Sequence, residues 1–335
     1  MNKKGVLLIN LGTPESKDLR DVHRYLTEFL TDGRVIDIPW LKRQLLVRGV
    51  IVPKRYKESA RNYERIWTQE GSPLKVHSRK MQEKLQAALG AAYQVELAMR
   101  YQMPSIESVL EKLKGCLKIT VIPLFPQYSS AATGSAMQKT MEVMSQWTTI
   151  PEVHFINSYP IQKEMIEAFC ERAREQNFSH YDHVVFSFHG LPEKHVRKAD
   201  LNNNCLKRAE CCALLCEKNK SCYSAQCHAT AQAIAGGLAL APKDFSICFQ
   251  SRLGKDPWLK PYTLNTLKSL IHENKKRVLV LSPAFVSDCL ETLDEIGYEY
   301  RKEFIEAGGE VLELVPALND HPLWIEALKS LVLSA

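Results

Sequence analysis

Short apolar runs alternate along the chain with longer stretches in which apolar positions recur at helical spacing. Eight of these runs are rich in β-branched and aromatic residues and have the length of buried strands. They comprise residues 5–11, 94–99, 117–123, 152–157, 183–189, 244–249, 276–282 and 310–315. Strands that alternate with helices pair in parallel through βαβ units. The pattern therefore predicts an α/β protein with parallel sheets.

The eight predicted strands divide naturally into two groups of four. The third strand of each group ends in a proline and a polar turn, at Pro123 and Pro283. A chain of 335 residues also exceeds what one hydrophobic core usually serves. We expect two similar Rossmann-like domains, residues 1–160 and 161–315, each a four-stranded parallel sheet flanked by helices, facing each other across a cleft. Residues 316–335 are expected to form a C-terminal helix that packs back on the N-terminal domain.

Composition and charge restrict the class of partner. The chain has 45% hydrophobic and 24% charged residues and a net charge of +6. No apolar run has the length of a membrane span, and the start is too quickly polar for a signal peptide, so we expect a cytoplasmic protein. No basic run is long enough to indicate nucleic acid. The mild positive charge favours acidic small molecules or anionic lipid, including peripheral contact with the inner face of a membrane.

The first predicted strand ends in a tight turn at Gly12. A glycine turn after a strand can admit a phosphate group. One glycine, however, is far from a dinucleotide fingerprint or a P-loop, so the sequence argues against a nucleotide site here.

Residues 35–55 alternate apolar patches, at 35–40, 45–47 and 50–52, with lysines and arginines. One interpretation is an ordinary amphipathic helix packed on the first sheet. The other is a lip over a pocket, which touches a membrane or a large apolar ligand. The pattern favours the two about equally.

The run at residues 183–189 delivers His189 to the carboxyl end of a predicted buried strand. Gly190 and Pro192 stop the strand, and Pro192 disfavours a helix beginning directly at His189. Ligands of open parallel sheets bind just outside the carboxyl ends of strands. A functional histidine is therefore favoured over the alternative, a packed histidine bonded to a backbone carbonyl.

Three acidic residues follow the third strand of the second group. Asp288, Glu291 and Glu295 have the spacing of one face of a helix that starts near Ser287. Acidic residues in a first turn often only complement the helix macrodipole. If this strand neighbours the strand of His189, imidazole and carboxylate share one site. Such a pair suits a divalent transition metal or proton transfer near neutral pH.

Six of the ten cysteines lie within residues 205–227. Disulfides are rare in cytosolic proteins, so metal ligation is the favoured interpretation and a chance group of free thiols is the alternative. Four thiolates bind tetrahedral zinc or a [2Fe–2S] cluster, and the spacing does not distinguish them. Polar neighbours at residues 202–204 indicate a surface insertion, residues 200–227, that a metal would cross-link.

A series of motifs along the whole chain resembles the ferrochelatases, which insert ferrous iron into a porphyrin. The motifs occur in family order, and they are LINLGTP (8–14), GSPL (71–74), MRY (99–101), PQYS (126–129), FSFHGLP (186–192), FQSR (249–252), DPWL (256–259) and FVSDCLETL (285–293). The resemblance implies the chelatase-like fold of two Rossmann-like domains with the porphyrin between them. It also implies protoporphyrin IX as the substrate and haem synthesis as the pathway.

The resemblance assigns roles to individual positions. His189 and Glu291 match the active-site pair that binds iron or accepts protons, and Asp288 and Glu295 match the acidic row beside it. Residues 35–55 match the family's hydrophobic lip. Cys289 replaces a histidine found in some relatives and is assigned no role. The resemblance implies that the porphyrin is bound by Leu11, Arg55, Tyr63, Ser72, Arg100, Tyr101 and Trp258. Of these, Arg55 and Ser72 match residues that hold the porphyrin propionates.

Some ferrochelatases carry a [2Fe–2S] cluster, and the internal cysteine segment resembles relatives in which the cluster is internal. The expected ligands are Cys205, Cys212, Cys222 and Cys227. Cys211 is the alternative ligand, and Cys216 is expected to be dispensable. Zinc is the alternative metal. Two alternative functions accompany the ferrochelatase prediction. One is a related chelatase for coproporphyrin or for another metal, and the other is an iron–sulfur redox or sensor protein on the same scaffold.

Overall fold

The computed structural model describes residues 3–208, 210–252, 254 and 256–335. Contacts divide the chain into two compact units. Unit 1 comprises Met1–Phe125, Ser129–Asn157 and Ile325–Ala335, and unit 2 comprises Pro126–Tyr128 and Ser158–Trp324. The domain boundaries that we drew from the sequence stay a prediction.

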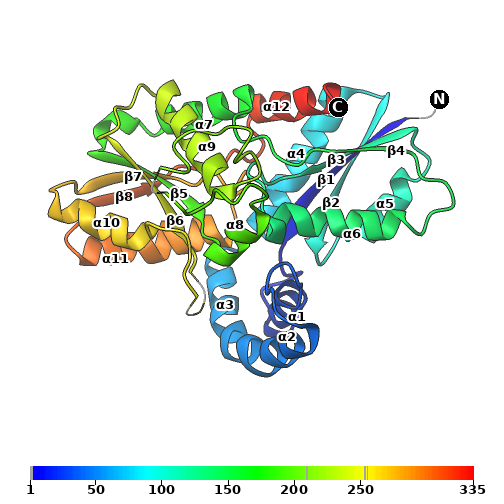
Figure 1. Cartoon of the computed structure of the whole chain (residues 1–335), viewed down its shortest axis with the longest axis horizontal. Coiled ribbons are helices and arrows are strands. Elements are labelled where there is room, and N and C mark those ends of the chain that lie inside the picture. The colour runs from blue at the N-terminus through cyan, green and yellow to red at the C-terminus, as the bar shows by residue number, and fades with distance from the viewer. Residues whose placement is uncertain (1–2, 209, 253, 255) are drawn as a thin grey trace. The chain divides into compact units, whose positions relative to one another are not determined.

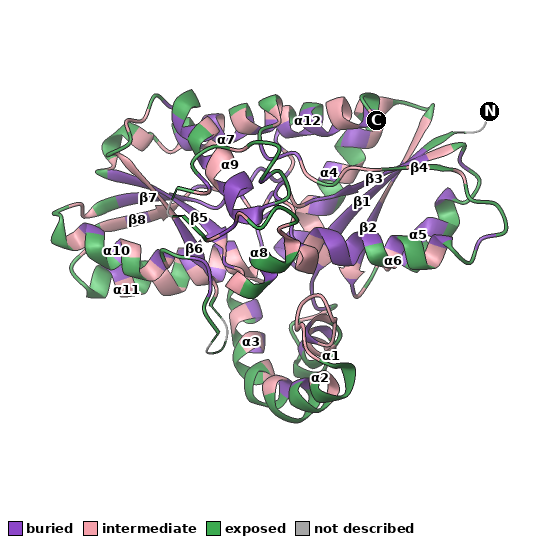
Figure 2. Ribbon diagram, in the orientation of Figure 1, coloured by how far each residue is buried: buried purple, intermediate pink, exposed green. Residues whose placement is uncertain are grey.

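Unit 1 contains a four-stranded, all-parallel sheet in the order β2-β1-β3-β4 (Figure 1). Its strands are β1 (Lys4–Gly12), β2 (Tyr93–Tyr101), β3 (Lys118–Pro123) and β4 (Glu152–Phe155). Figure 2 shows the central strands buried, as expected for a sheet covered on both faces, and this explains why they read as continuous apolar runs. The strand order reverses between β1 and β3, which makes their carboxyl ends the topological switch point of this sheet.

Helices cover the sheet of unit 1 and extend from it. They are α1 (Leu19–Leu30), α2 (Trp40–Leu46), α3 (Val52–Ile66), α4 (Pro73–Leu89), α5 (Ile106–Leu113) and α6 (Ser135–Met144), with π-helical turns at Val47–Ile51 and Ser130–Gly134. Apolar side chains of α5 and α6, such as Val109 and Ala136, pack with Leu7, Ile9 and Val121 of the strands in one buried cluster. Ser105 begins α5 by accepting a hydrogen bond from the Ser108 backbone N–H.

The lip, residues 35–55, has a small core of its own. Its buried residues are Leu30, Val47 and Val52, and partly buried apolar side chains of α1 pack around them. Figure 1 shows α1, α2 and α3 gathered together beyond the edge of the sheet of unit 1. The interpretation of this segment as an amphipathic helix packed on the sheet is therefore wrong, because its apolar side chains pack against α1 instead.

Unit 2 repeats the architecture with the sheet order β6-β5-β7-β8, again all parallel. Its strands are β5 (His183–His189), β6 (Phe245–Gln250), β7 (Arg277–Leu281) and β8 (Val311–Leu314). The helices are α7 (Lys163–Glu175), α8 (Glu193–Ala199), α9 (Tyr223–Gly237), α10 (Thr263–His272), a π-helical segment at Glu291–Tyr300 and α11 (Arg301–Glu306). The last helix, α12 (Pro322–Leu333), begins in unit 2 and belongs to unit 1 from Ile325 onward. A short 3-10 turn occupies Phe178–His180.

The core of unit 2 lies between its sheet and the helices that follow β6 and β7. Val185, Val280 and Leu312 of the strands pack with Leu267 and Phe304 in one buried cluster. All eight predicted strands are confirmed, with ends that differ by at most two residues. Within the described part of the chain, no helix is both long enough and apolar enough to cross a membrane.

Candidate active site

The candidate site of unit 2 lies at the switch point of its sheet. The strand order reverses between β5 and β7, which are hydrogen-bonded neighbours. His189 is the last residue of β5, and the segment with the three acidic residues follows β7. The sequence analysis predicted a shared site for His189 and the acidic residues if their two strands were neighbours. They are neighbours in the sheet.

His189 is half-buried, and its ring is oriented by its own backbone neighbour. Its Nδ1 lies 2.6 Å from the carbonyl oxygen of Gly190. In the neutral imidazole, Nδ1–H donates to this carbonyl, and Nε2 then carries the lone pair. A bond to a backbone carbonyl was the structural alternative to a functional histidine. Here the two are compatible, because one nitrogen fixes the ring while the other keeps its lone pair.

Two aromatic rings flank the imidazole. The ring centroids of Trp258 and Phe285 each lie 6.3 Å from that of His189. Gly190 permits this packing, because a Cβ there would lie 2.8 Å from the Gln250 carbonyl oxygen and 3.1 Å from Cε3 of Trp258. The glycine of the FSFHGLP motif is thus required by the close approach of β6 and Trp258.

The acidic segment differs from its prediction in where its helix begins. Helical geometry starts at Leu290, not near Ser287, and Glu291–Tyr300 is π-helical. Asp288 therefore lies in the preceding loop and not on the helix face. π-Helical segments are rare and occur frequently at functional sites.

Asp288 is buried and fully engaged in holding the loop. Its carboxylate accepts hydrogen bonds from Thr292 Oγ1 at 3.1 Å, from Asn319 Nδ2 at 2.7 Å and from the Ala317 backbone N–H at 3.3 Å. The Asp288 backbone N–H donates in turn to Asn319 Oδ1 at 2.9 Å. These bonds attach the start of the helix to the segment that follows β8.

Glu295 is also saturated by donors, which come mainly from the end of β6. Its carboxylate accepts from Gln250 Nε2 at 3.1 Å, from Tyr300 OH at 2.7 Å and from Ser251 Oγ. Burial and the adjacent Glu295 charge raise the pKa of the Tyr300 hydroxyl, which therefore remains a donor. Glu291 lies between Asp288 and Glu295 in the sequence. It is half-buried and lies beside the Cys289 thiol.

Gln250 connects His189 to the acidic segment. It is the register partner of His189 across β5 and β6, and its Nε2 donates both to Glu295 and to the Glu291 carbonyl oxygen at 2.8 Å. Its Oε1 accepts from Ser187 Oγ at 2.8 Å. The sequence analysis did not assign a role to Gln250. The available signal was its place in the FQSR motif, as a polar residue directly after a predicted buried strand.

The cysteine segment reaches this site through α9. Tyr223, in the first turn of α9, donates from its hydroxyl to the His189 carbonyl oxygen at 2.8 Å. Cys222 directly precedes it as the helix N-cap residue. The conformation of the cysteine segment and the position of His189 are thus connected by one hydrogen bond.

Thiols gather around Cys222. Cys205 and Cys212 both interact with the Cys222 thiol, and the Sγ atoms of Cys211 and Cys212 lie 3.6 Å apart. The Cys222 contact and burial raise the pKa of Cys212, and burial raises the pKa of Cys205 to about 11. Cys227, fully buried, has its pKa raised by burial and lies near Cys212. Among the described residues, no three or more His, Cys, Asp or Glu side chains are arranged as a metal site.

The predicted porphyrin residues of unit 1 lie at two strand ends, on α3 and at the start of α4. Ser72 is buried, with its hydroxyl 2.8 Å from Thr13 Oγ1, just beyond the half-buried Leu11 at the end of β1. On α3, Arg55 is exposed, whereas Tyr63 is buried and lies edge-on to Tyr25.

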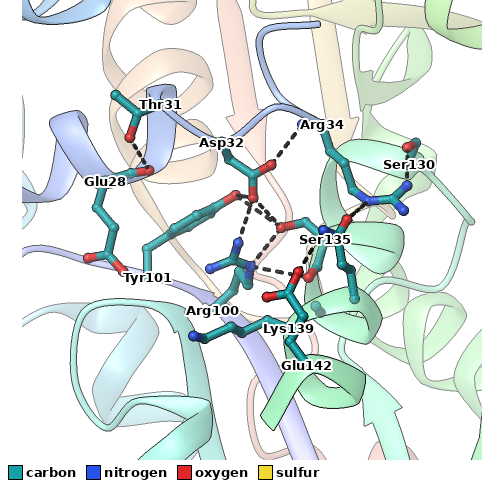
Figure 3. A network of polar contacts seen from close by, with 12 residues as sticks. Glu28, Thr31, Asp32, Arg34, Arg100, Tyr101, Ser130, Ser135, Lys139 and Glu142 are labelled. Atoms are coloured by element: carbon teal, nitrogen blue, oxygen red, sulfur yellow. Dashed lines mark hydrogen bonds and ion pairs between the residues drawn. The ribbon is translucent and has the colours of Figure 1, made fainter. Parts of the chain in front are cut away.

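Arg100 and Tyr101, at the end of β2, form a network with Asp32 that the sequence did not indicate (Figure 3). Arg100 Nη2 donates to Asp32 Oδ2 at 2.7 Å, and the fully buried Tyr101 donates its hydroxyl to the same oxygen at 2.9 Å. Both side chains therefore point to a carboxylate of the protein itself.

Comparison with known proteins gives matches over nearly the whole chain. The ferrochelatase family model matches residues 3–335. A ferrochelatase of Legionella pneumophila (strain Lens) is 45% identical over 333 residues, which cover 98% of each chain. A ferrochelatase of Bdellovibrio bacteriovorus is 42% identical over 345 residues and is covered completely, as is this chain.

Among solved structures, SirB from Bacillus subtilis with Fe³⁺ has a similar fold. Its TM-score is 0.56 at 13% sequence identity, and the match covers 99% of this chain and 95% of that one. The sirohydrochlorin chelatase SirB of Bacillus subtilis subspecies spizizenii, in complex with cobalt, gives a TM-score of 0.54 at the same identity, over 98% of this chain and 93% of that one. At this identity the likeness concerns the fold, two parallel four-stranded sheets flanked by helices.

Proposed function

Because this chain belongs to the ferrochelatase family, whose members insert ferrous iron into a porphyrin, we propose that His189 and Glu291 carry out this insertion and that protoporphyrin IX is the porphyrin. The chain is an enzyme of the lyase class, and its reaction serves haem synthesis. The comparisons do not favour the alternatives, which were a coproporphyrin or other metal chelatase and an iron–sulfur redox or sensor protein.

The observation that carries the assignment is the orientation of His189. Insertion must remove two protons from pyrrole nitrogens while the metal loses water. With Nδ1–H donated to the Gly190 carbonyl oxygen at 2.6 Å, Nε2 presents a lone pair that accepts a pyrrole proton or binds ferrous iron. The ring is held before substrate arrives, so no reorientation is needed during the reaction.

Glu291 supplies the negative charge of the pair. Its neighbours Asp288 and Glu295 each accept three hydrogen bonds from the protein, so their charges are already compensated. Glu291 faces a thiol, which is a weak donor. Its carboxylate is the member of the acidic row best able to bind a cation or take a proton, and Gln250 holds its backbone in register with His189.

We assign porphyrin binding to the residues that the family resemblance implies. Those of unit 1, at strand ends, on α3 or at the start of α4, are Leu11, Arg55, Tyr63, Ser72, Arg100 and Tyr101, and Trp258 is the one beside His189. Arg55 is exposed and suits a propionate, since a guanidinium pairs with carboxylate in bidentate fashion. Arg100 and Tyr101 act through Asp32, as argued below.

The test is anaerobic incubation of the purified protein with ferrous iron and protoporphyrin IX, followed by visible spectroscopy. Enzyme-dependent conversion of the free-base bands to those of haem is expected, and coproporphyrin is expected to react more slowly. His189→Ala should abolish conversion yet still bind porphyrin, while His272→Ala, at the exposed end of α10, should behave as wild type. Retained turnover in His189→Ala would refute the role of His189.

The cysteine segment is proposed to hold a [2Fe–2S] cluster, with zinc as the alternative. The donor chemistry fits, because Cys205, Cys211, Cys212 and Cys222 bring thiol groups together. Cys211 thereby becomes a ligand candidate equal to Cys227. When bound, the cluster would supply a redox-active group and a cross-link of the insertion. Metal analysis and the visible spectrum of the protein as purified would distinguish iron–sulfur from zinc.

The lip is proposed to rest on an anionic membrane surface, at the cytoplasmic face. Trp40, Leu41 and Leu45 are 66%, 62% and 67% exposed, and Lys42 and Arg48 lie among them. Exposed apolar side chains ringed by cations are typical of peripheral membrane contact.

Sedimentation with anionic vesicles provides the test. Trp40→Ser combined with Leu45→Ser should reduce vesicle binding about tenfold or more, since both side chains would lose apolar burial. Leu117→Ser is the matched control, because Leu117 is 60% exposed and precedes β3 at the opposite edge of the sheet. Equal binding by the two variants would refute a role for the lip.

A further inference from the structure

Asp32 lies where the chain leaves α1 and enters the lip, and its carboxylate is saturated by donors from elsewhere in unit 1. Oδ2 accepts from Arg100 Nη2 at 2.7 Å, from Tyr101 OH at 2.9 Å and from Ser135 Oγ at 2.5 Å (Figure 3). Oδ1 accepts from the Arg34 backbone N–H at 2.7 Å. We call Asp32, Arg34, Arg100, Tyr101 and Ser135 the Asp32 cluster.

The cluster joins three elements that are far apart in sequence. Arg100 and Tyr101 end β2, Ser135 begins α6, and Asp32 follows α1. Arg100 Nε also donates to Ser135 Oγ at 2.6 Å, which closes the cluster into a ring of charged and hydroxyl groups. The end of β2 and the start of α6 therefore share one anchor with the lip.

Neighbouring contacts support the same attachment. Arg34 donates from Nη1 to Ser130 Oγ at 2.8 Å and from Nε to Gln138 Oε1 at 2.6 Å. Within the lip, Arg43 donates from Nε to the Thr31 carbonyl oxygen at 2.8 Å and from Nη1 to that of Ile38 at 2.7 Å. The start of the lip is thus bonded to the carboxyl edge of the sheet, and α2 is bonded to the start of the lip.

The charges in the cluster are compensated internally. Burial disfavours the charged carboxylate of Asp32, but hydrogen bonds from Ser135 and Arg34 and the charge of Arg100 outweigh it and keep its pKa below 3.8. Asp32 and Arg100 form an ion pair whose side chains are 9% and 17% exposed. An arginine paired in this way is not a free cation for a substrate carboxylate, and Tyr101, fully buried, presents no surface to a ligand.

We propose that Asp32 is a positioning residue that fixes the lip on the carboxyl edge of the unit 1 sheet, and that Arg100 and Tyr101 serve the porphyrin by holding Asp32. This rests on the proposed function, in which the lip borders the porphyrin site. A fixed lip meets its ligand without first being ordered, so the ordering cost is removed from porphyrin binding. The reacting groups, His189 and Glu291, do not depend on it.

The first experiment measures amide hydrogen exchange by mass spectrometry and needs no activity. Asp32→Asn keeps the shape of the side chain and removes its charge. Exchange over residues 33–56 should accelerate about tenfold, the equivalent of one lost charge-assisted hydrogen bond. Exchange in α5 should remain within about twofold of wild type, because its buried side chains pack in the apolar core cluster of the sheet, which includes none of the residues of the Asp32 cluster.

Asp18→Asn is the matched control. It makes the same chemical change at the other end of α1, where the side chain forms no helix-capping hydrogen bond. Ser135→Ala removes one of the donors to Asp32 and should give a smaller acceleration of the same residues, which keeps the test decisive if Asp32→Asn folds poorly. The proposal would be overturned if the lip of Asp32→Asn exchanged no faster than that of Asp18→Asn. It would also be overturned if Asp32→Asn accelerated exchange equally in the lip and in α5.

Kinetics then separate positioning from chemistry. Asp32→Asn should raise the KM for protoporphyrin about tenfold and leave kcat within about threefold, because only the binding geometry is disturbed. A fall in kcat with unchanged KM would refute a positioning role. If wild-type protein fails to insert iron, the proposed function fails, while the exchange experiment still reports on the attachment of the lip.

Discussion

Replacing Gly12 by alanine should test how closely β1 and β2 approach at the carboxyl edge of the unit 1 sheet. Gly12 has φ +113°, a region that residues with a side chain rarely adopt. An added Cβ would lie 2.0 Å from the Tyr101 carbonyl oxygen. Gly12 and Tyr101 are register partners at the end of the β1–β2 ladder, so the obstacle is backbone and not a movable side chain.

The magnitude follows from two separate costs. The unfavourable φ costs about 1–3 kcal/mol, and the steric shift of packed backbone costs about another 1–3 kcal/mol. Reduced freedom of the unfolded chain returns about 0.4–1 kcal/mol. The net loss in free energy of unfolding should be about 1–5 kcal/mol, which is large for a protein of ordinary stability.

Gly71→Ala isolates the first cost. Gly71 has φ +114°, and its added Cβ would meet nothing within 4 Å, so only the backbone strain applies. Urea unfolding followed by circular dichroism gives the free energy of unfolding of each variant. If the two variants have the same dependence of this free energy on urea concentration, their unfolding midpoints can be compared directly. Gly12→Ala should exceed Gly71→Ala by about 1–3 kcal/mol. A difference below about 0.5 kcal/mol would refute the argument from the Tyr101 carbonyl.

Three further substitutions probe backbone, packing and protonation. Gly49→Ala, at an exposed helical position whose Cβ would meet nothing within 4 Å, should raise the free energy of unfolding by about 0.5–1 kcal/mol in the same urea assay. Gly237→Ala should cost about 1–3 kcal/mol, since its Cβ would lie 2.6 Å from Cys170 Sγ, and adding Cys170→Ala should remove most of that cost; additive losses in this double-mutant cycle would contradict the clash. Burial, and then Lys275, lower the pKa of His183 to about 4, so stability is complete above pH 6.5 and falls between pH 6.5 and 4 as the unfolded state takes up a proton. In His183→Asn this loss, up to about 3 kcal/mol, should be absent from the pH dependence of the free energy of unfolding. The same pH dependence in wild type and variant would show that other groups cause it.

The sequence determined the elements and the family. Each strand is recognisable because a buried parallel strand needs a run of apolar residues, which is a local property of the chain. His189 and Glu291 could be singled out because they follow such runs and lie in motifs of the family. The division into two groups of four strands likewise required only the order of the runs.

Tertiary structure decided how these parts act on one another. The spacing of Asp288 suggested a helix face, but bonds to Asn319 and Ala317, about thirty residues away, hold it in a loop and move the start of the helix to Leu290. The packing of the lip was also decided by tertiary structure. Its apolar side chains pack against those of α1 and not against the sheet.

The partners of a charged group are the least predictable feature, and Asp32 illustrates why. Its neighbours in sequence, a threonine and a glycine, give no sign of a special role. The residues that bind it are separated from it by 68, 69 and 103 positions. Periodicity indicates which side chains are buried, but the pairing of a buried charge depends on which strands and helices the fold brings together, and only the folded chain specifies that.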